Sequence, residues 1–202
     1  SQYDDPNSLP NNYIRSLVRA NTHSLWVGTL DGLAKMDLIN NKVIRYRISK
    51  QSMGNHVNDL MLDSNERLWI ATKSGVFYKD REDEFVKVSL LITRGLANKK
   101  EEIEPQAFKI VKGPAGAIWI ATNKGLFWLD PKNNNLLNIS LKSEVEDKVK
   151  PVAVLKFAVF DLVFDHEGIL WLGTEKGLIR LDLIEFNQTI GSDISIPIVE
   201  NS

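Results

Sequence analysis

The sequence predicts an all-β protein of the β-propeller type, built from four tandem blades of four antiparallel strands. The first observation is a nine-residue pattern of apolar, Trp, apolar, Gly or Ala, Thr, two variable residues, Gly and apolar. It occurs at Leu25–Leu33, Leu68–Val76, Ile118–Leu126 and Leu170–Leu178. The second is that short apolar, β-branched and aromatic runs separated by polar turns surround each copy, as expected for strands. The third is the spacing, since repeats of roughly 40 to 50 residues are typical of propeller blades.

The second copy illustrates the four strands of a blade. Its apolar runs predict strands over 57–62, 68–72, 76–79 and 85–88, joined by polar turns at 63–67, 73–75 and 80–84. Gly75 closes the second of these turns and is expected to have a positive φ, which glycine adopts without a steric penalty. One such blade cannot bury both of its faces, so neighbouring blades are expected to stack through their Trp and Leu side chains.

The other copies fit this frame position for position. An aspartate stands eleven residues after each repeat Trp and is expected to cap the turn after the third strand, at Asp37, Asp80, Asp130 and Asp182. The four repeat tryptophans themselves are expected in the core, at Trp26, Trp69, Trp119 and Trp171. Trp128 falls outside the pattern, and the sequence leaves open whether it is packed or marks a contact surface.

The blades are expected at about 11–50, 54–92, 105–141 and 157–190, forming one module over 1–190 with a tail at 191–202. Residues 1–9 are expected to be the outer strand of an incomplete or closing blade, and longer charged loops are expected at 93–105 and 142–151. These features indicate a fragment or a partial propeller. Because open sheet edges tend to pair, we expect closure as a four-bladed ring, a homodimer of about eight blades, or pairing with further blades.

Composition excludes several classes of function. Apolar residues make up 43% of the chain and charged residues 25%, and the net charge is −1, which gives no electrostatic footprint for nucleic acid or an anionic membrane. The absence of cysteine removes disulfides, thiolate catalysis and Cys-ligated zinc. The three histidines have no metal-ligand spacing, and there is no phosphate-binding Gly-rich loop, so no metal and no cofactor are expected.

The variable turn residues are the first candidate site. In a propeller, the turn between the second and third strands lies on the same face as the connection into the next first strand. Side chains with mixed charge, together with Tyr and His, suit a sugar or another polar ligand. The alternative is that these are ordinary solvated turns. The candidate ligand-binding residues on this turn face are Tyr13, Asp31, His56, Lys73, Lys124, Glu175 and Lys176.

A second candidate site follows from the residues ten positions before each repeat Trp, on the innermost strand. These are Ser16, Asp59, Lys109 and Asp161, and near a propeller axis they would line a polar channel. One hypothesis is that they act on a glycan or polymer as the catalytic groups of a propeller enzyme. The alternative is that they are solvated or paired, Lys109 with Asp59 or with Asp161.

The stretch from Ser8 to Ile14, followed by Leu25 to Thr29, Gly32, Leu33 and Asp37, resembles the two-component regulator propeller repeat. The resemblance covers about residues 8–190. It implies a periplasmic propeller module that senses a ligand, often a carbohydrate fragment, and signals to a histidine kinase across the inner membrane. This sequence departs from the pattern in its Asp-x-x-Gly turn, which is complete only at Asp165–Gly168. Such sensors also contain an immunoglobulin-like domain, a membrane helix and a kinase outside the repeats, so we expect this sequence to be a fragment or a truncated product.

Three functions are therefore considered. The first is a non-enzymatic ligand-sensing module of a two-component sensor, with an oligosaccharide as its candidate ligand and the membrane reached only through other parts of a parent protein. The second is an enzyme that acts through the channel residues. The third is a structural segment that oligomerises through its open edges.

Overall fold

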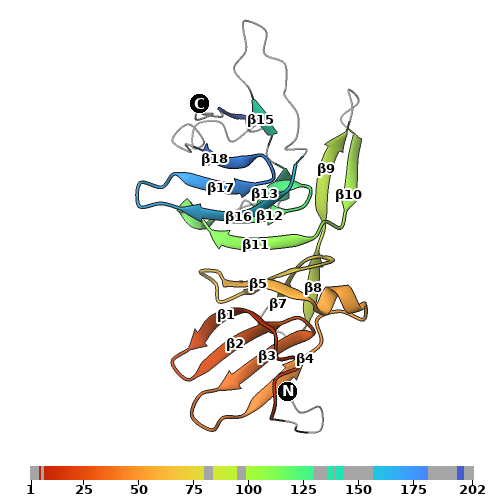
Figure 1. The fold of residues 1–202 in the computed structure, drawn as a ribbon, viewed down its shortest axis with the longest axis vertical. Coiled ribbons are helices and arrows are strands. Elements are labelled where there is room, and N and C mark those ends of the chain that lie inside the picture. The colour runs from red at the N-terminus through yellow and green to blue at the C-terminus, as the bar shows by residue number, and fades with distance from the viewer. Residues whose placement is uncertain are drawn as a thin grey trace, which may run out of the picture. The chain divides into compact units, whose positions relative to one another are not determined.

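The computed structural model describes residues 5, 7–79, 84–94, 99–129, 136–138, 140–142, 157–181 and 195–197. Apart from two short 3-10 turns, η1 (Ser52–Asn55) and η2 (Pro114–Gly116), its regular elements are β-strands (Figure 1). No helix in these residues is long and apolar enough to cross a membrane. The chain forms two compact units, Ser1–Val88 with Glu104–Ile110, and Ser89–Ile103 with Val111–Ser202.

The first unit contains two four-stranded antiparallel sheets, each ordered as in the chain. The first sheet comprises β1 (Ile14–Asn21), β2 (Ser24–Thr29), β3 (Gly32–Asp37) and β4 (Val43–Tyr46). The second comprises β5 (Val57–Leu62), β6 (Leu68–Thr72), β7 (Gly75–Lys79) and β8 (Phe85–Val88). The four predicted strands of the second repeat are confirmed, with β7 beginning one residue earlier than expected.

The repeat continues in the second unit. One sheet has the order β11 (Ala107–Lys112), β12 (Ile118–Thr122), β13 (Gly125–Leu129) and β14 (Leu136–Asn138), with β11 beginning in the first unit. The next has the order β16 (Val159–Phe164), β17 (Leu170–Thr174) and β18 (Gly177–Leu181). The fourth strand expected within 182–190 lies outside the described residues, as does the expected loop at 143–151. The single module over 1–190 stays a prediction.

One expectation for the connections is wrong. The segment 93–105 is not a charged loop, because β9 (Leu90–Arg94) pairs antiparallel with β10 (Lys99–Ile103). The β-branched run Ile92–Thr93 favours a strand, and its partner strand is the charged stretch itself. The strand β19 (Ser195–Pro197) lies within the expected tail and pairs in parallel with β15 (Ser140–Lys142), and the extent of the tail stays a prediction.

The expectation of an outer strand at residues 1–9 is also wrong for the part that the structure describes. Asp5 instead organises a turn, since its carboxylate accepts the amide of Asn7 at 2.8 Å and its carbonyl accepts the amide of Ser8 at 3.0 Å. The guanidinium of Arg45, on β4, donates to the carbonyl of Ser8 at 2.8 Å and to the Ser8 hydroxyl. The segment is therefore a turn held against the outer strand of the first blade.

The hairpin turns follow the sequence prediction. Gly32, Gly75, Gly125 and Gly177 have φ values of 125°, 115°, 114° and 108°. The repeat threonines, Thr29, Thr72, Thr122 and Thr174, donate to the carbonyls of these glycines at 2.8 to 2.9 Å and accept an amide from within the turn. Asp37 accepts the amides of Ile39 and Asn40, as expected for a turn cap. The other three predicted caps lie outside the described residues.

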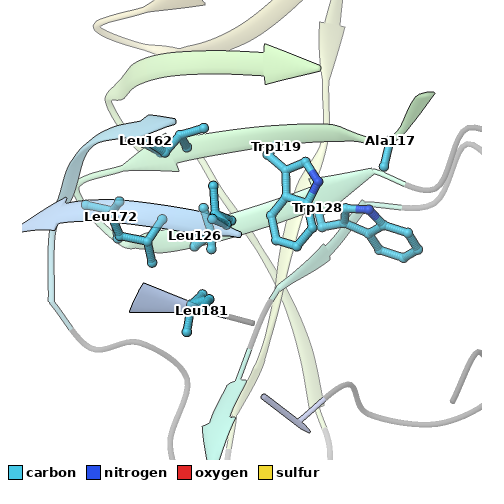
Figure 2. Packing of buried hydrophobic residues seen from close by; sticks show 10 residues of the cluster. Ala117, Trp119, Leu126, Trp128, Leu162, Leu172 and Leu181 are labelled. Carbon is cyan, nitrogen blue, oxygen red and sulfur yellow. The ribbon is translucent and has the colours of Figure 1, made fainter. Parts of the chain in front are cut away.

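The repeat tryptophans lie in the core, as predicted, with the last one less covered. Trp26, Trp69 and Trp119 are 7%, 2% and 1% exposed, whereas Trp171 is half-buried. Trp128 is also buried, and its ring centroid lies 6.4 Å from that of Trp119. Figure 2 shows these two side chains next to each other in the core cluster of the second unit. Trp128 is thus a packing residue.

Successive blades pack through equivalent positions in both units. In the first unit, a Cβ placed on Gly28 would lie 2.5 Å from Cγ1 of Val57, so glycine admits the branched side chain of the next blade. Trp26 and Leu33 share one core cluster with Val57 and Leu60. In the second unit, the corresponding residues Leu126, Val159 and Leu162 share another cluster (Figure 2).

Candidate functional site

The carboxylate of Asp59 links the first strands of three successive blades. Its Oδ1 accepts the hydroxyl of Ser16, on β1, at 2.8 Å. Its Oδ2 accepts the backbone amide of Ile110, on β11, at 3.1 Å and lies 3.4 Å from Nζ of Lys109. The Ser16 hydroxyl in turn accepts the amide of Leu60 at 3.1 Å. The first strands of the second and third blades thus each donate a backbone amide to the side chain that stands ten residues before the Trp of the preceding blade.

This polar cluster contains three of the four residues expected to line a channel. Asp59 is 7% exposed, and both of its oxygens are engaged by donors. Asp161 lies in the other unit, is exposed, and accepts the amide of Leu162 at 2.9 Å. A buried carboxylate saturated by donors from neighbouring strands is suited to holding those strands together, and this geometry favours a structural role for Asp59 over a catalytic one.

The turn face of the first unit brings the other candidates together in pairs. The amide of Leu30, in the turn between β2 and β3, donates to the carbonyl of Tyr13 at 3.2 Å, which places Asp31 beside Tyr13. The amide of Lys73, in the turn between β6 and β7, donates to the carbonyl of His56 at 3.1 Å. The equivalent contact in the second unit joins Glu175 to Ala158 at 3.1 Å. Lys124, Glu175 and Lys176 are exposed at turns of that unit.

The imidazole of His56 is held in its neutral form. Partial burial lowers its pKa below the ordinary value of 6.5, and the charges of Lys73 and Arg15 lower it further. At neutral pH the ring therefore offers one donor and one acceptor. Tyr13, with 70% of its surface exposed, supplies an aromatic face on the neighbouring blade. A neutral imidazole and a phenol can each exchange hydrogen bonds with hydroxyl groups, and the cations near His56 can attract carboxylates.

Asn55 positions this face, and the sequence analysis missed its role. Its side chain is 1% exposed, and its Oδ1 accepts the amides of Ile48 and Ser49 at 2.8 and 3.2 Å. Its Nδ2 donates to the carbonyls of Ser49 and Gln51 at 2.8 and 3.1 Å. These bonds fold the connection between β4 and β5 and so fix His56, the next residue. One sequence feature indicates this role: an asparagine stands fourteen residues before the repeat Trp in two copies, at Asn12 and Asn55.

At the opposite end of the blades, the aspartates of the turns hold the repeat tryptophans in place. Asp63 Oδ2 accepts the indole N–H of Trp69 at 2.9 Å, and Asp165 Oδ2 accepts that of Trp171 at 2.8 Å. His23 lies in the turn between β1 and β2, and His166 in the turn between β16 and β17. No group of three or more His, Asp or Glu residues suited to a metal ion occurs in the described part of the chain.

The Asp165 turn gives a testable acid dependence. The indole N–H of Trp171 lowers the pKa of Asp165 below 3.8, with further help from the amides of Ile169 and Glu167. A carboxylate with a lowered folded pKa contributes stability that is present above the unfolded value and is lost as the pH falls through the folded value. We expect D165N to lower the melting temperature at pH 7, with a gap from wild type that narrows below pH 3.8.

The matched variant for this turn is W171F, which keeps an aromatic ring and removes the N–H donor. It should raise the pKa of Asp165 and shrink the acid-dependent part of the stability. Melting curves recorded from pH 7 down to below 3.8 check both variants. An equal loss for D165N at every pH would contradict the assignment of this turn.

Two segments of the chain, residues 8–31 and 51–74, match the two-component regulator propeller family. Over 85 aligned residues the chain is 32% identical to histidine kinase P4 of Formosa agariphila. The aligned region covers 39% of this chain and 6% of that protein. Both matched segments include the turn face of the first unit, with Tyr13 and Asp31 in one and His56 and Lys73 in the other. These two segments are therefore similar to regulator propeller repeats, and the chain spans a small part of the curated relative's length.

Solved structures share the fold. The extracellular domain of the hybrid two-component system BT4673 from B. thetaiotaomicron superposes with a TM-score of 0.64 at 16% identity, covering 84% of this chain and 21% of that one. The extracellular domain of the hybrid two-component system BT3049 from the same organism gives 0.64 at 22% identity, with 87% and 24% covered. The four-stranded antiparallel blades are thus those of a β-propeller, and this chain spans about a quarter or less of these domains.

Proposed function

We propose that this chain, as a carrier of two-component regulator propeller repeats, is a sensing module of a two-component system that binds a ligand without turning it over. The observation that carries the proposal is the family match over residues 8–31 and 51–74. The identity to a histidine kinase supports a parent protein in which binding is relayed to a kinase. In this role the propeller recognises the signal and other segments of the parent protein transmit it.

The proposed location is periplasmic. The structures with a similar fold include extracellular domains of hybrid two-component systems, which supports a module on the outer side of the inner membrane. The absence of cysteine is compatible with this, because the fold depends on no thiol chemistry. Fractionation of the native organism with an antibody against this chain would test the location, and recovery in the cytoplasm would contradict it.

The proposed ligand is an oligosaccharide or a similar polar molecule, bound at the turn face of the first unit. Tyr13 offers a ring for stacking on a sugar, and neutral His56 offers a donor and an acceptor for hydroxyl groups. Arg15 and Lys73 bring positive charge to the surroundings of His56 and lower its pKa further, after the larger effect of burial. This electrostatic environment favours sugars that carry carboxylates over neutral sugars.

Titration calorimetry with a panel of neutral oligosaccharides and oligouronates tests this proposal. We expect an oligouronate to bind, and H56A and Y13A each to weaken it by roughly tenfold, which corresponds to one lost polar or stacking contact. The matched control is H23A, which removes a histidine at the other end of the first blade and should leave the affinity unchanged. Absence of binding across the panel would contradict the ligand class, and equal weakening by H23A would contradict the placement.

A further inference from the structure

The first strand of a blade carries one extra residue close to its start. The register between β1 and β2 shifts between Ile14 and Ser16, so Arg15 stands opposite no residue of β2. The same shift occurs in β5 around Asn58 and in β16 around Phe160. An insertion of this kind is a β-bulge, which bends the strand and re-aims a side chain, often next to a functional site. The bulge residue therefore occupies an equivalent point in each of these blades.

The second blade shows where the side chain of the bulge residue points. Nδ2 of Asn58 donates to the carbonyl of Ala107 at 2.7 Å. Ala107 is the first residue of β11, the first strand of the following blade. The residue equivalent to Ala107 in the second blade is Val57, which directly follows His56. By the same geometry, Arg15 extends from β1 toward the start of β5 and its neighbour His56.

Two observations agree with this direction of Arg15. The charge of Arg15 lowers the pKa of His56, after the larger effects of burial and of Lys73. The next residue, Ser16, donates its hydroxyl to Asp59 of the second blade at 2.8 Å, so this part of β1 faces the second blade. The guanidinium of Arg15 therefore lies in the surroundings of the His56 imidazole, at the turn face of the first unit.

The guanidinium of Arg15 is available to a ligand. Arg15 is exposed, and within the part of the chain that the structure describes its side chain forms no hydrogen bond and no ion pair. At the equivalent position, by contrast, the amide of Asn58 is engaged by the following blade. The N–H donors of an arginine form a planar fork that matches the two oxygens of a carboxylate. The first blade thus presents an uncommitted carboxylate-binding group beside His56.

The bulge position varies in chemistry between the copies, whereas the position before it stays apolar. The bulge position lies eleven residues before the repeat Trp and holds Arg15, Asn58, Phe108 and Phe160. The preceding position holds Ile14, Val57, Ala107 and Val159. A side chain that changes from copy to copy on a constant backbone can alter recognition without altering the blade.

We propose that Arg15 is the specificity-determining residue of the ligand site, and that it holds one carboxylate of the sugar in a bidentate pair next to His56. This inference rests on the proposed function, because it assigns a contact within the same site. Lys73 adds positive charge, but its ammonium group lacks the planar fork. A neutral sugar keeps its contacts with Tyr13 and His56 and gains nothing from Arg15.

Calorimetry with the oligouronates of the panel and their methyl esters tests the role of Arg15. Wild type should bind the acids roughly 10- to 100-fold more tightly than the esters, as expected for one charge-assisted hydrogen-bonded pair. R15Q should lose most of this preference by weakening the binding of the acids while leaving that of the esters unchanged. R15K should recover only part of the preference, because it restores the charge without the fork.

The matched control is R19Q, which removes the same charge from the same strand. Arg19 is exposed and lies four residues further along β1, roughly 13 Å away along the strand. R19Q should therefore keep the full preference for the acids. If wild type binds the acids and R15Q keeps the preference, or R19Q loses it, the role of Arg15 is overturned and the proposed ligand class stands. Failure of wild type to bind any oligouronate would contradict both.

An NMR titration of the His56 imidazole gives a second readout that needs no ligand. R15Q should raise the pKa of His56, because it removes a positive charge that disfavours the imidazolium. R19Q should leave the pKa of His56 unchanged. A pKa of His56 that is the same in R15Q and wild type would overturn the placement of Arg15 beside this residue.

Discussion

Replacing Leu126 with alanine is expected to lower the free energy of unfolding by about 2–5 kcal/mol, the range for leucines deleted from well-packed cores. Leu126 is 0% exposed and lies in the cluster formed with Trp119 and Leu162 (Figure 2). The cavity left by the substitution would sit between two blades, where strands on both sides restrict collapse. Urea denaturation of the chain, followed by tryptophan fluorescence, measures this loss.

The matched substitution is L178A, at the same repeat position and within the same unit. Leu178 is 70% exposed, so at protein concentrations where the chain is monomeric the change should stay within about 0.5 kcal/mol. The two variants remove the same atoms and differ only in whether another blade covers the site. Similar losses for L126A and L178A would contradict the conclusion that blade-on-blade packing gives this position its energetic weight.

Replacing Asp59 with alanine is expected to lower the free energy of unfolding by about 1–3 kcal/mol, the cost of leaving a buried donor without its acceptor. The amide of Ile110 loses its hydrogen bond, and Ser16 loses the acceptor of its hydroxyl. Lys109, whose side chain is 39% exposed, can be rehydrated, so its contribution is smaller. D59N keeps an acceptor oxygen and should lose less. The same urea denaturation provides the comparison.

D161A is the control for Asp59, because it removes an exposed carboxylate from the same repeat position. Its effect on the monomer should be small. A double-mutant cycle between S16A and D59A should give a coupling energy of about 0.5–3 kcal/mol, as expected for residues in one network. Additive losses, or a D161A variant as unstable as D59A, would show that Asp59 does not link the strands. Activity on a glycan that both substitutions abolish would favour the enzyme hypothesis instead.

The blade could be predicted from the sequence because the turn residues, the apolar strand residues and the spacing of the copies all indicate the same four-stranded unit. The Thr and Gly of each copy specify one hairpin, and the positive φ of Gly75 follows from the tight turn it closes. The Trp and its apolar neighbours specify which side chains are shared between blades. These are local rules repeated at a fixed spacing, so four copies in one chain made them visible.

The misplaced elements lie outside the repeat. The strands β9 and β10 have no counterpart in the other repeats, and the Lys and Glu residues of β10 are typical of a loop although the partner β9 is rich in apolar residues. The turn at Asp5 depends on Arg45, which is forty positions away in the chain, and no local pattern reports such a contact. Non-local polar contacts of this kind are not encoded in periodicity.

Part of each candidate site could be predicted from the repeat, and the contacts between repeats could not. Propeller topology predicted that the β2–β3 turn with Asp31 lies on the same face as Tyr13, and that the β6–β7 turn with Lys73 lies on the same face as His56. The sequence does not predict that Ser16 and Lys109 meet at the carboxylate of Asp59, because this one aspartate binds two neighbouring strands of different repeats. It does not predict the hydrogen bonds of Asn55 either, since asparagines are common in turns and few are buried with both amide groups satisfied.

The central claim, that the turn face of the first unit binds the ligand, is tested most directly by hydrogen exchange with and without a bound oligouronate. The amides of Leu30 and Lys73 donate to the carbonyls of Tyr13 and His56. The backbone amides of the β2–β3 and β6–β7 turns should exchange more slowly in the complex. The amides of the turns at 21–23 and 63–67, at the other end of the blades, should keep their exchange rates. Protection confined to the turns at 21–23 and 63–67 would contradict the claim.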